Sequence, residues 1–194
     1  MTSALYSNSF YRSVSLETDR LILTPPAVDD FVDMYSMWSD REIVGQVIGS
    51  PLTQEEVWAR LHRIVGHWVL MGFGHWIVRE RRSKKFVGEL GFFRFKRELT
   101  PDFDKAHEIG WMIAKECQGF GYATEAATAA LKWVEAESDC NETVCIIAPD
   151  NLASLALAEK LSYKLTDEIT YRGRAMLILR RNATGRDASS SMCK

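Results

Sequence analysis

The run Gln118-Gly119-Phe120-Gly121-Tyr122-Ala123 has the residue types of an anion-binding loop. Glycine adopts positive φ at little cost and lets a ligand approach the main chain closely. A helix expected from Gly121 would leave its first N–H groups without intrahelical partners and would carry partial positive charge there. The run therefore predicts an anion site, most often one for phosphate, with a glycine-rich turn that only leads into a helix as the alternative.

Two familiar phosphate motifs do not fit this loop. A Walker loop ends in Gly-Lys-Ser/Thr, which is absent here. A dinucleotide fingerprint starting at Gly119 would have Thr124 in place of its third glycine, and the acidic residue about twenty positions on, Glu142, would open the next strand rather than end it. Binding of a nicotinamide dinucleotide is therefore disfavoured.

Two carboxylates in strand-like runs are candidates for a general base. Glu108 shares a strand face with Gly110 and Met112, and Glu89 lies between Gly88 and Leu90. Either carboxylate could instead be solvated or make a structural hydrogen bond. We name Glu108 as the catalytic candidate of the two.

Metal and thiol chemistry are not expected. His62 and His67 would point about 140° apart on a helix, and neither His75 nor His107 has a partner in the sequence. The four cysteines form no CxxC pair, which argues against a zinc site and against a disulfide framework. Cys117 has no assigned base, so a covalent cysteine mechanism is not expected.

Alternating and helical apolar patterns predict the elements that position these residues. Strands are expected at residues 19–24, 75–79, 86–95, 107–113, 143–148, 164–171 and 174–181. Helices are expected at residues 28–39, 53–72, 121–138 and 151–161. Thr53 and Glu56 form a capping-box pattern at the start of the second helix. This order predicts an α/β fold with a mixed sheet covered by helices.

Composition limits the class of protein further. The chain has 194 residues, 46% of them hydrophobic and 26% charged, and a net charge of −2. These values suit one domain at residues 16–181, between a flexible arm at 1–15 and a flexible tail at 182–194. No apolar run of about 18 residues and no signal-peptide pattern is visible in these residues, so we expect neither a membrane span nor a signal peptide. The net charge of −2 provides no positive field that would attract nucleic acid. We expect a cytoplasmic protein that binds neither membrane nor nucleic acid.

Several motifs, in this order, resemble the GNAT superfamily of acyl-CoA-dependent N-acyltransferases, in its ribosomal-protein (RimJ/RimL-like) branch. They are DRLILTPP, PLTQEE, GFGHWIV, FVGELGF, EIGWMI, GYATEAATAAL and PDNLASLALAEKLSY, together with Gln118-x-x-Gly121-x-Ala123. The resemblance implies a GNAT fold: a mixed, mostly antiparallel sheet of six to seven strands, flanked by about four helices, with a gap for pantetheine. It also implies acetyl-CoA as cosubstrate and no metal.

The resemblance also assigns roles to single residues. The residues implied to bind the cofactor are Trp111, Met112, Ile113, Gln118, Gly119, Phe120, Gly121, Tyr122, Ala123 and Asn151. Ser154 stands where a serine is proposed to protonate the leaving thiolate, although it could be an ordinary first-turn residue. Ala158 stands where many members carry a tyrosine acid, and Leu161-Ser162-Tyr163 departs from the family's Leu-Gly-Phe.

The acceptor must be an amine that can lose a proton. Deprotonation at pH 7 costs roughly 4–5 kcal/mol for a lysine but only about 1 kcal/mol for an α-amino group. A peptide N-terminus is therefore the easier acceptor, and small amines, aminoglycosides and a non-catalytic acyl-CoA-binding module are the alternatives. Residues 43–51 and 98–105 are expected to select the acceptor. Monomer and homodimer both stay open.

Overall fold

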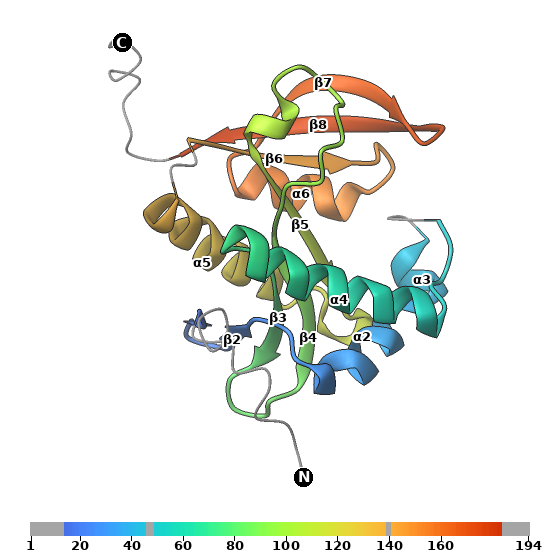
Figure 1. The fold of residues 1–194 in the computed structure, drawn as a ribbon, viewed down its shortest axis with the longest axis vertical. Coiled ribbons are helices and arrows are strands. Elements are labelled where there is room, and N and C mark those ends of the chain that lie inside the picture. Colours follow the sequence, from blue (N-terminus) through green and yellow to red (C-terminus); the bar gives the residue numbers. More distant parts are fainter. Residues whose placement is uncertain (1–13, 46–48, 139–140, 184–194) are drawn as a thin grey trace. The chain divides into compact units, whose positions relative to one another are not determined.

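The computed structural model describes residues 14–45, 49–138 and 141–183 (Figure 1). Most of the expected arm at 1–15, most of the expected tail at 182–194, and part of the 43–51 stretch lie outside these residues. The chain divides into two compact units. Unit 1 comprises residues 1–93 and 109–130, and unit 2 comprises residues 94–108 and 131–194.

Unit 1 consists of strands and helices, and its first four strands pair antiparallel. Its strands are β1 (Leu16–Glu17), β2 (Leu21–Thr24), β3 (His75–Glu80), β4 (Phe86–Phe93) and most of β5 (His107–Ile113). They are hydrogen-bonded in that order. Its helices are α2 (Phe31–Trp38), α3 (Arg41–Val44), α4 (Gln54–Met71) and the first part of α5 (Tyr122–Glu137).

Helix α4 has the boundaries that its sequence predicts. The Thr53 hydroxyl accepts a hydrogen bond from the Glu56 N–H, and the Glu56 carboxylate accepts one from the Thr53 N–H, so the capping box is present. The helix ends at Gly72. Its inner face contributes Trp68, whose ring lies 5.0 Å from that of Trp76 in β3. Both rings are fully buried in the core of this unit.

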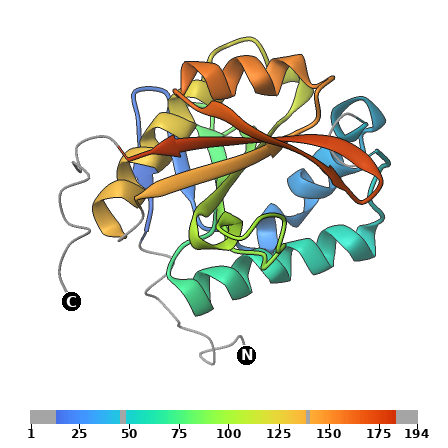
Figure 2. The same ribbon diagram turned by 90° about the horizontal axis from the view of Figure 1, so that it is seen from above.

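Unit 2 contains the remaining elements: β6 (Glu142–Ile147), α6 (Leu152–Lys160), β7 (Lys164–Tyr171) and β8 (Arg174–Asn182). The first two residues of β5 pair in parallel with β6, as His107↔Thr143 and Glu108↔Val144. Strand β8 is antiparallel to both β6 and β7. Figure 2 shows β7 and β8 as a long twisted hairpin.

The fold that the sequence predicts is confirmed, with small differences. The described residues contain eight strands and five α-helices rather than six to seven strands and about four helices. The additional elements are β1, of two residues, and α3, of four, which are too short to show a period. Strand β8 extends to Asn182, the first residue of the expected tail. None of the described helices is long and apolar enough to cross a membrane.

Candidate active site

The loop between β5 and α5 leaves a row of main-chain N–H groups open. Gly119 and Gly121 have φ of 80° and 79°, in the left-handed region that favours glycine, and residues 118–121 are exposed. The first recorded N–H bond of α5 runs from Glu125 to the Gly121 carbonyl, at 3.1 Å. Among the described residues, the N–H groups of residues 119–124 have no recorded acceptor. A loop of this shape at a helix N-terminus suits a diphosphate.

Side chains attach this loop to the elements on either side of it. The Gln118 amide donates to the Ile113 carbonyl at 3.0 Å, which joins the loop to the end of β5. Glu125, in the first turn of α5, accepts three hydrogen bonds from the β1–β2 turn. The donors are the Thr18 hydroxyl at 2.5 Å, the Arg20 N–H at 2.9 Å and the Arg20 Nε at 2.6 Å. Burial alone would raise the pKa of Glu125, but these hydrogen bonds outweigh it and lower that pKa.

Strand β5 presents the main chain of the predicted pantetheine residues. On one side, β4 approaches so closely that a Cβ at Gly88 would lie 2.1 Å from the Met112 carbonyl oxygen. The Ala114 N–H donates to the Val87 carbonyl at 2.9 Å. The parallel ladder with β6 consists of the two register pairs at His107 and Glu108. Trp111 is half-buried, whereas Met112 and Ile113 are buried.

Asn151 and Ser154 lie together at the start of α6, in unit 2. The Asn151 Oδ1 accepts a hydrogen bond from the Ser154 N–H at 3.1 Å and caps the helix. Asn151 is buried and Ser154 is half-buried. The ordinary helix-capping role is therefore present, and the cofactor and proton-donor roles stay predictions.

Glu108 is held by an arginine that the sequence did not single out. Arg97 donates to both carboxylate oxygens, from Nε at 2.7 Å and from Nη2 at 3.1 Å, and its Nη1 donates to the Tyr171 hydroxyl at 2.6 Å. Burial raises the pKa of Glu108, and Arg97 opposes that rise. Both oxygens have partners, as in a structural ion pair. The role of Glu108 as a base stays a prediction.

A second buried cluster lies in unit 1. The Arg60 guanidinium, from α4, donates through Nε and Nη2 to the fully buried Glu89 carboxylate, and His75 Nδ1 lies 3.5 Å from the same oxygen. Burial lowers the pKa of His75 to about 4. Burial would raise the pKa of Glu89, but Arg60 and His75 bring it down to about 2. At neutral pH the cluster is an Arg60–Glu89 ion pair beside a neutral imidazole.

The described cysteines are buried, and the described His, Cys, Asp and Glu side chains are the candidates for metal ligands. Cys117 and Cys145 are free and buried, and burial raises the pKa of both thiols. The Cys117 Sγ donates to the Phe86 carbonyl at 3.6 Å. Within the described ranges, no three His, Cys, Asp or Glu side chains are grouped to hold a metal ion.

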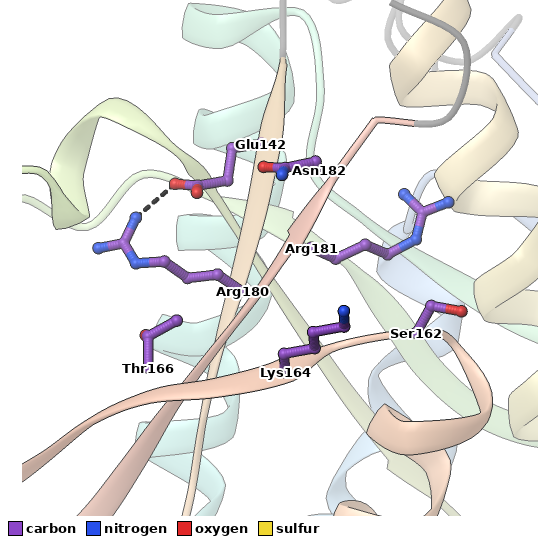
Figure 3. A pocket seen from close by; sticks show the side chains of 7 residues that line it. All are labelled: Glu142, Ser162, Lys164, Thr166, Arg180, Arg181 and Asn182. Atoms are coloured by element: carbon purple, nitrogen blue, oxygen red, sulfur yellow. Dashed lines mark hydrogen bonds and ion pairs between the residues drawn. The ribbon is translucent and has the colours of Figure 1, made fainter. Parts of the chain in front are cut away.

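A hollow with a volume of about 360 Å³ lies on β6, β7 and β8 (Figure 3). Most of the basic side chains that line it are already in ion pairs with carboxylates. Its lining residues are Glu142, Ser162, Lys164, Thr166, Arg180, Arg181 and Asn182. Arg180 pairs with Glu142 and Arg181 pairs with Glu135. Among the described residues that line the hollow, only the Lys164 ammonium is a cation without an ion-pair partner, so we assign no ligand to this hollow.

Comparison with known proteins gives one consistent result. A family model described as an acetyltransferase (GNAT) domain matches residues 20–164. YkkB of Bacillus subtilis, a protein without an assigned activity, is 34% identical over 90 residues, which are 46% of this chain and 50% of YkkB.

Solved structures agree with the family match. One titled as a GNAT-family acetyltransferase from Bordetella pertussis is 33% identical, with a TM-score of 0.78, and the match covers 86% of this chain and 98% of that one. RimL, titled as a ribosomal L7/L12 α-N-protein acetyltransferase in complex with coenzyme A, has a TM-score of 0.71 at 18% identity. That match covers 85% of this chain and 95% of RimL, and at this identity it shows a shared fold.

Proposed function

Because this chain belongs to the GNAT family of acetyltransferases, we propose that it transfers acetyl from acetyl-CoA to a primary amine, most readily a peptide N-terminal α-amine. The observation that carries the proposal is the loop at residues 118–123. Its two left-handed glycines leave main-chain donors open at the N-terminus of α5. These donors fit the diphosphate of coenzyme A, and the Gln118–Ile113 bond joins them to β5.

The remaining cofactor contacts follow the strand and the next helix. The main-chain groups of Trp111, Met112 and Ile113 are proposed to pair with the pantetheine arm as if it were an added strand. One of their amides would face the thioester carbonyl and stabilise its oxyanion. Asn151 would contact the pantetheine, and Ser154 would give a proton to the departing thiolate.

Direct attack of the amine in a ternary complex is the simplest course for the reaction. A covalent relay through Cys117 would need a thiolate, and burial holds the pKa of this thiol above its usual value. The preference for an α-amine rests on the lower cost of deprotonating it.

Release of coenzyme A thiol from acetyl-CoA tests this proposal against a panel of amines. One form of a peptide would have a free N-terminus as its acceptor. The other form would have a blocked N-terminus and a single internal lysine as its acceptor. Spermidine and an aminoglycoside would represent small amines. Turnover that needs the free N-terminus is expected. Turnover with small amines alone would reassign the acceptor, and tight coenzyme A binding without turnover on any amine would indicate a binding module.

A further inference from the structure

Arg20 reaches the diphosphate loop from the turn between β1 and β2, all within unit 1. Its Nη1 donates to the Phe120 carbonyl at 2.9 Å, and its Nε donates to Glu125 at 2.6 Å. The guanidinium carbon lies 4.7 Å from the centre of the Tyr122 ring. Arg20 therefore holds the loop on one side and the first turn of α5 on the other.

The third nitrogen of this guanidinium has no use within the described protein. No acceptor is recorded for Nη2 among the described residues, and a Cβ built on Gly121 would lie 3.5 Å from it. The Arg20 side chain is 47% exposed. Nη2 is thus an open cationic donor beside the glycine whose N–H belongs to the proposed diphosphate cradle.

The planar guanidinium suits this position better than an ammonium would. Its donors are fixed in one plane, so two of them can be committed to protein acceptors while the third faces outward. A charge-assisted hydrogen bond to a phosphate oxygen is shorter and stronger than a neutral one. Glu125 fixes the guanidinium in place but contacts it at Nε, which leaves Nη2 free for a ligand.

We propose that Arg20 binds the diphosphate of coenzyme A through Nη2 while its Nη1 and Nε hold the loop in its binding shape. This inference rests on the proposed function, because it assumes that the loop accepts a coenzyme A diphosphate. It adds a residue that lies about a hundred positions before the loop and outside its motif.

Calorimetric titration of the full chain with coenzyme A, dephospho-coenzyme A and pantetheine tests this assignment. Arg20→Lys and Arg20→Ala should each weaken coenzyme A binding about 10-fold or more. Both variants should lose affinity for dephospho-coenzyme A by the same factor, because this ligand keeps the diphosphate. The affinity for pantetheine, which has no phosphate, should change by less than about 2-fold. This weaker binding would be measured by NMR at millimolar ligand concentration.

Arg81→Ala is the matched control, because Arg81 is a nearby exposed arginine that pairs with Glu17 instead of the loop. It should leave all three affinities unchanged. Thermal unfolding of Arg20→Lys should change only slightly, because the Arg20–Glu125 pair that it weakens is partly exposed. A loss of affinity in this variant would then report on ligand binding and not on folding.

Three results would overturn the inference: no loss of coenzyme A affinity, an equal loss for pantetheine, or a loss for coenzyme A that dephospho-coenzyme A does not share. The last result would assign Arg20 to the 3′-phosphate. If wild type itself fails to bind coenzyme A, the proposed function falls with it. If Gly121→Asp abolishes binding and the Arg20 variants do not, only the role of Arg20 falls.

Discussion

Gly121 lies where the backbone shape of the loop and the positive charge of Arg20 meet. Its φ of 79° favours glycine, and a Cβ built on it would lie at ordinary contact distance, 3.5 Å, from the Arg20 Nη2. An aspartate there would pair with the guanidinium and repel a diphosphate from the N-terminus of α5.

Gly121→Asp is therefore expected to weaken coenzyme A binding about 10-fold or more, measured by calorimetry. Gly173→Asp is the matched control, because Gly173 has a φ of 76° with nothing near its missing Cβ. Both variants introduce the same residue in the same backbone region, so their stabilities should fall alike. Coenzyme A affinity equal in the two variants would show that the loop does not bind the diphosphate.

Ser154 is a residue whose two proposed roles make different kinetic predictions. If it protonates the leaving thiolate, Ser154→Ala should lower kcat about 10²-fold and leave acetyl-CoA affinity nearly unchanged. Its N–H bond to Asn151 survives the substitution, because that bond uses the main chain.

Steady-state kinetics on the best acceptor provides the measurement. Thr128→Ala, which removes a helical hydroxyl bonded to the Thr124 carbonyl in α5, is the control and should keep wild-type kcat. A Ser154→Ala enzyme with unchanged kcat would leave the serine as a first-turn residue and rule out its role as the acid.

At the scale of elements, the turn after α6 places Ser162 in a left-handed conformation that disfavours residues with a side chain. Ser162 follows the helix with a φ of 67°, where the related motif carries glycine. A residue with a Cβ in this region costs about 1–2 kcal/mol. Serine at this position therefore makes the turn less stable than glycine would.

Ser162→Gly should raise the free energy of unfolding by about 0.5–1 kcal/mol, since relief of the strain exceeds the added entropy of the unfolded chain. Urea unfolding measures this change. The reverse substitution at a comparable site, Gly173→Ser, should destabilise the protein by a similar amount. A less stable Ser162→Gly protein would mean that the serine hydroxyl makes a contact worth more than the strain.

The elements show which features can be predicted from sequence. The start of α4 could be predicted because Thr53 and Glu56 are three residues apart and cap each other locally. The Arg20–Glu125 and Arg60–Glu89 pairs could not, because 105 and 29 positions separate the partners and nothing local marks either one. The strand pattern indicates Glu108 as a candidate carboxylate, but its partner Arg97 lies in a loop with no periodic pattern.

At the scale of the whole molecule, the buried His75–Glu89 pair makes stability depend on pH. The folded pKa of His75 is about 4 against an ordinary value of 6.5, so between these values the unfolded chain binds a proton that the folded chain does not. The free energy of unfolding should therefore fall as pH falls from about 6.5 to 4. The lowered pKa of Glu89 continues the loss from about 4.5 to 2.

The contribution of His75 should be about 2–3 kcal/mol between pH 7 and pH 4, measured by urea unfolding at several pH values. His75→Gln should flatten this part of the profile, whereas His62→Gln, at an exposed histidine on α4, should not. Equal acid sensitivity in wild type and His75→Gln would mean that the imidazole is already charged in the fold.

The close contact of β3 with β4 has a consequence for how this sequence can vary. A Cβ at Gly91 would lie 2.2 Å from the Gly74 carbonyl oxygen and 2.5 Å from the His75 Cα, and both are main-chain atoms that no rotamer change can move aside. Gly66, on α4, has nothing within 4 Å of its missing Cβ. In a saturation library selected for folded protein, position 91 should lose every codon except glycine, even alanine. Position 66 should keep most of its alternative residues. The two glycines should therefore differ sharply in how many substitutions the selected sequences contain.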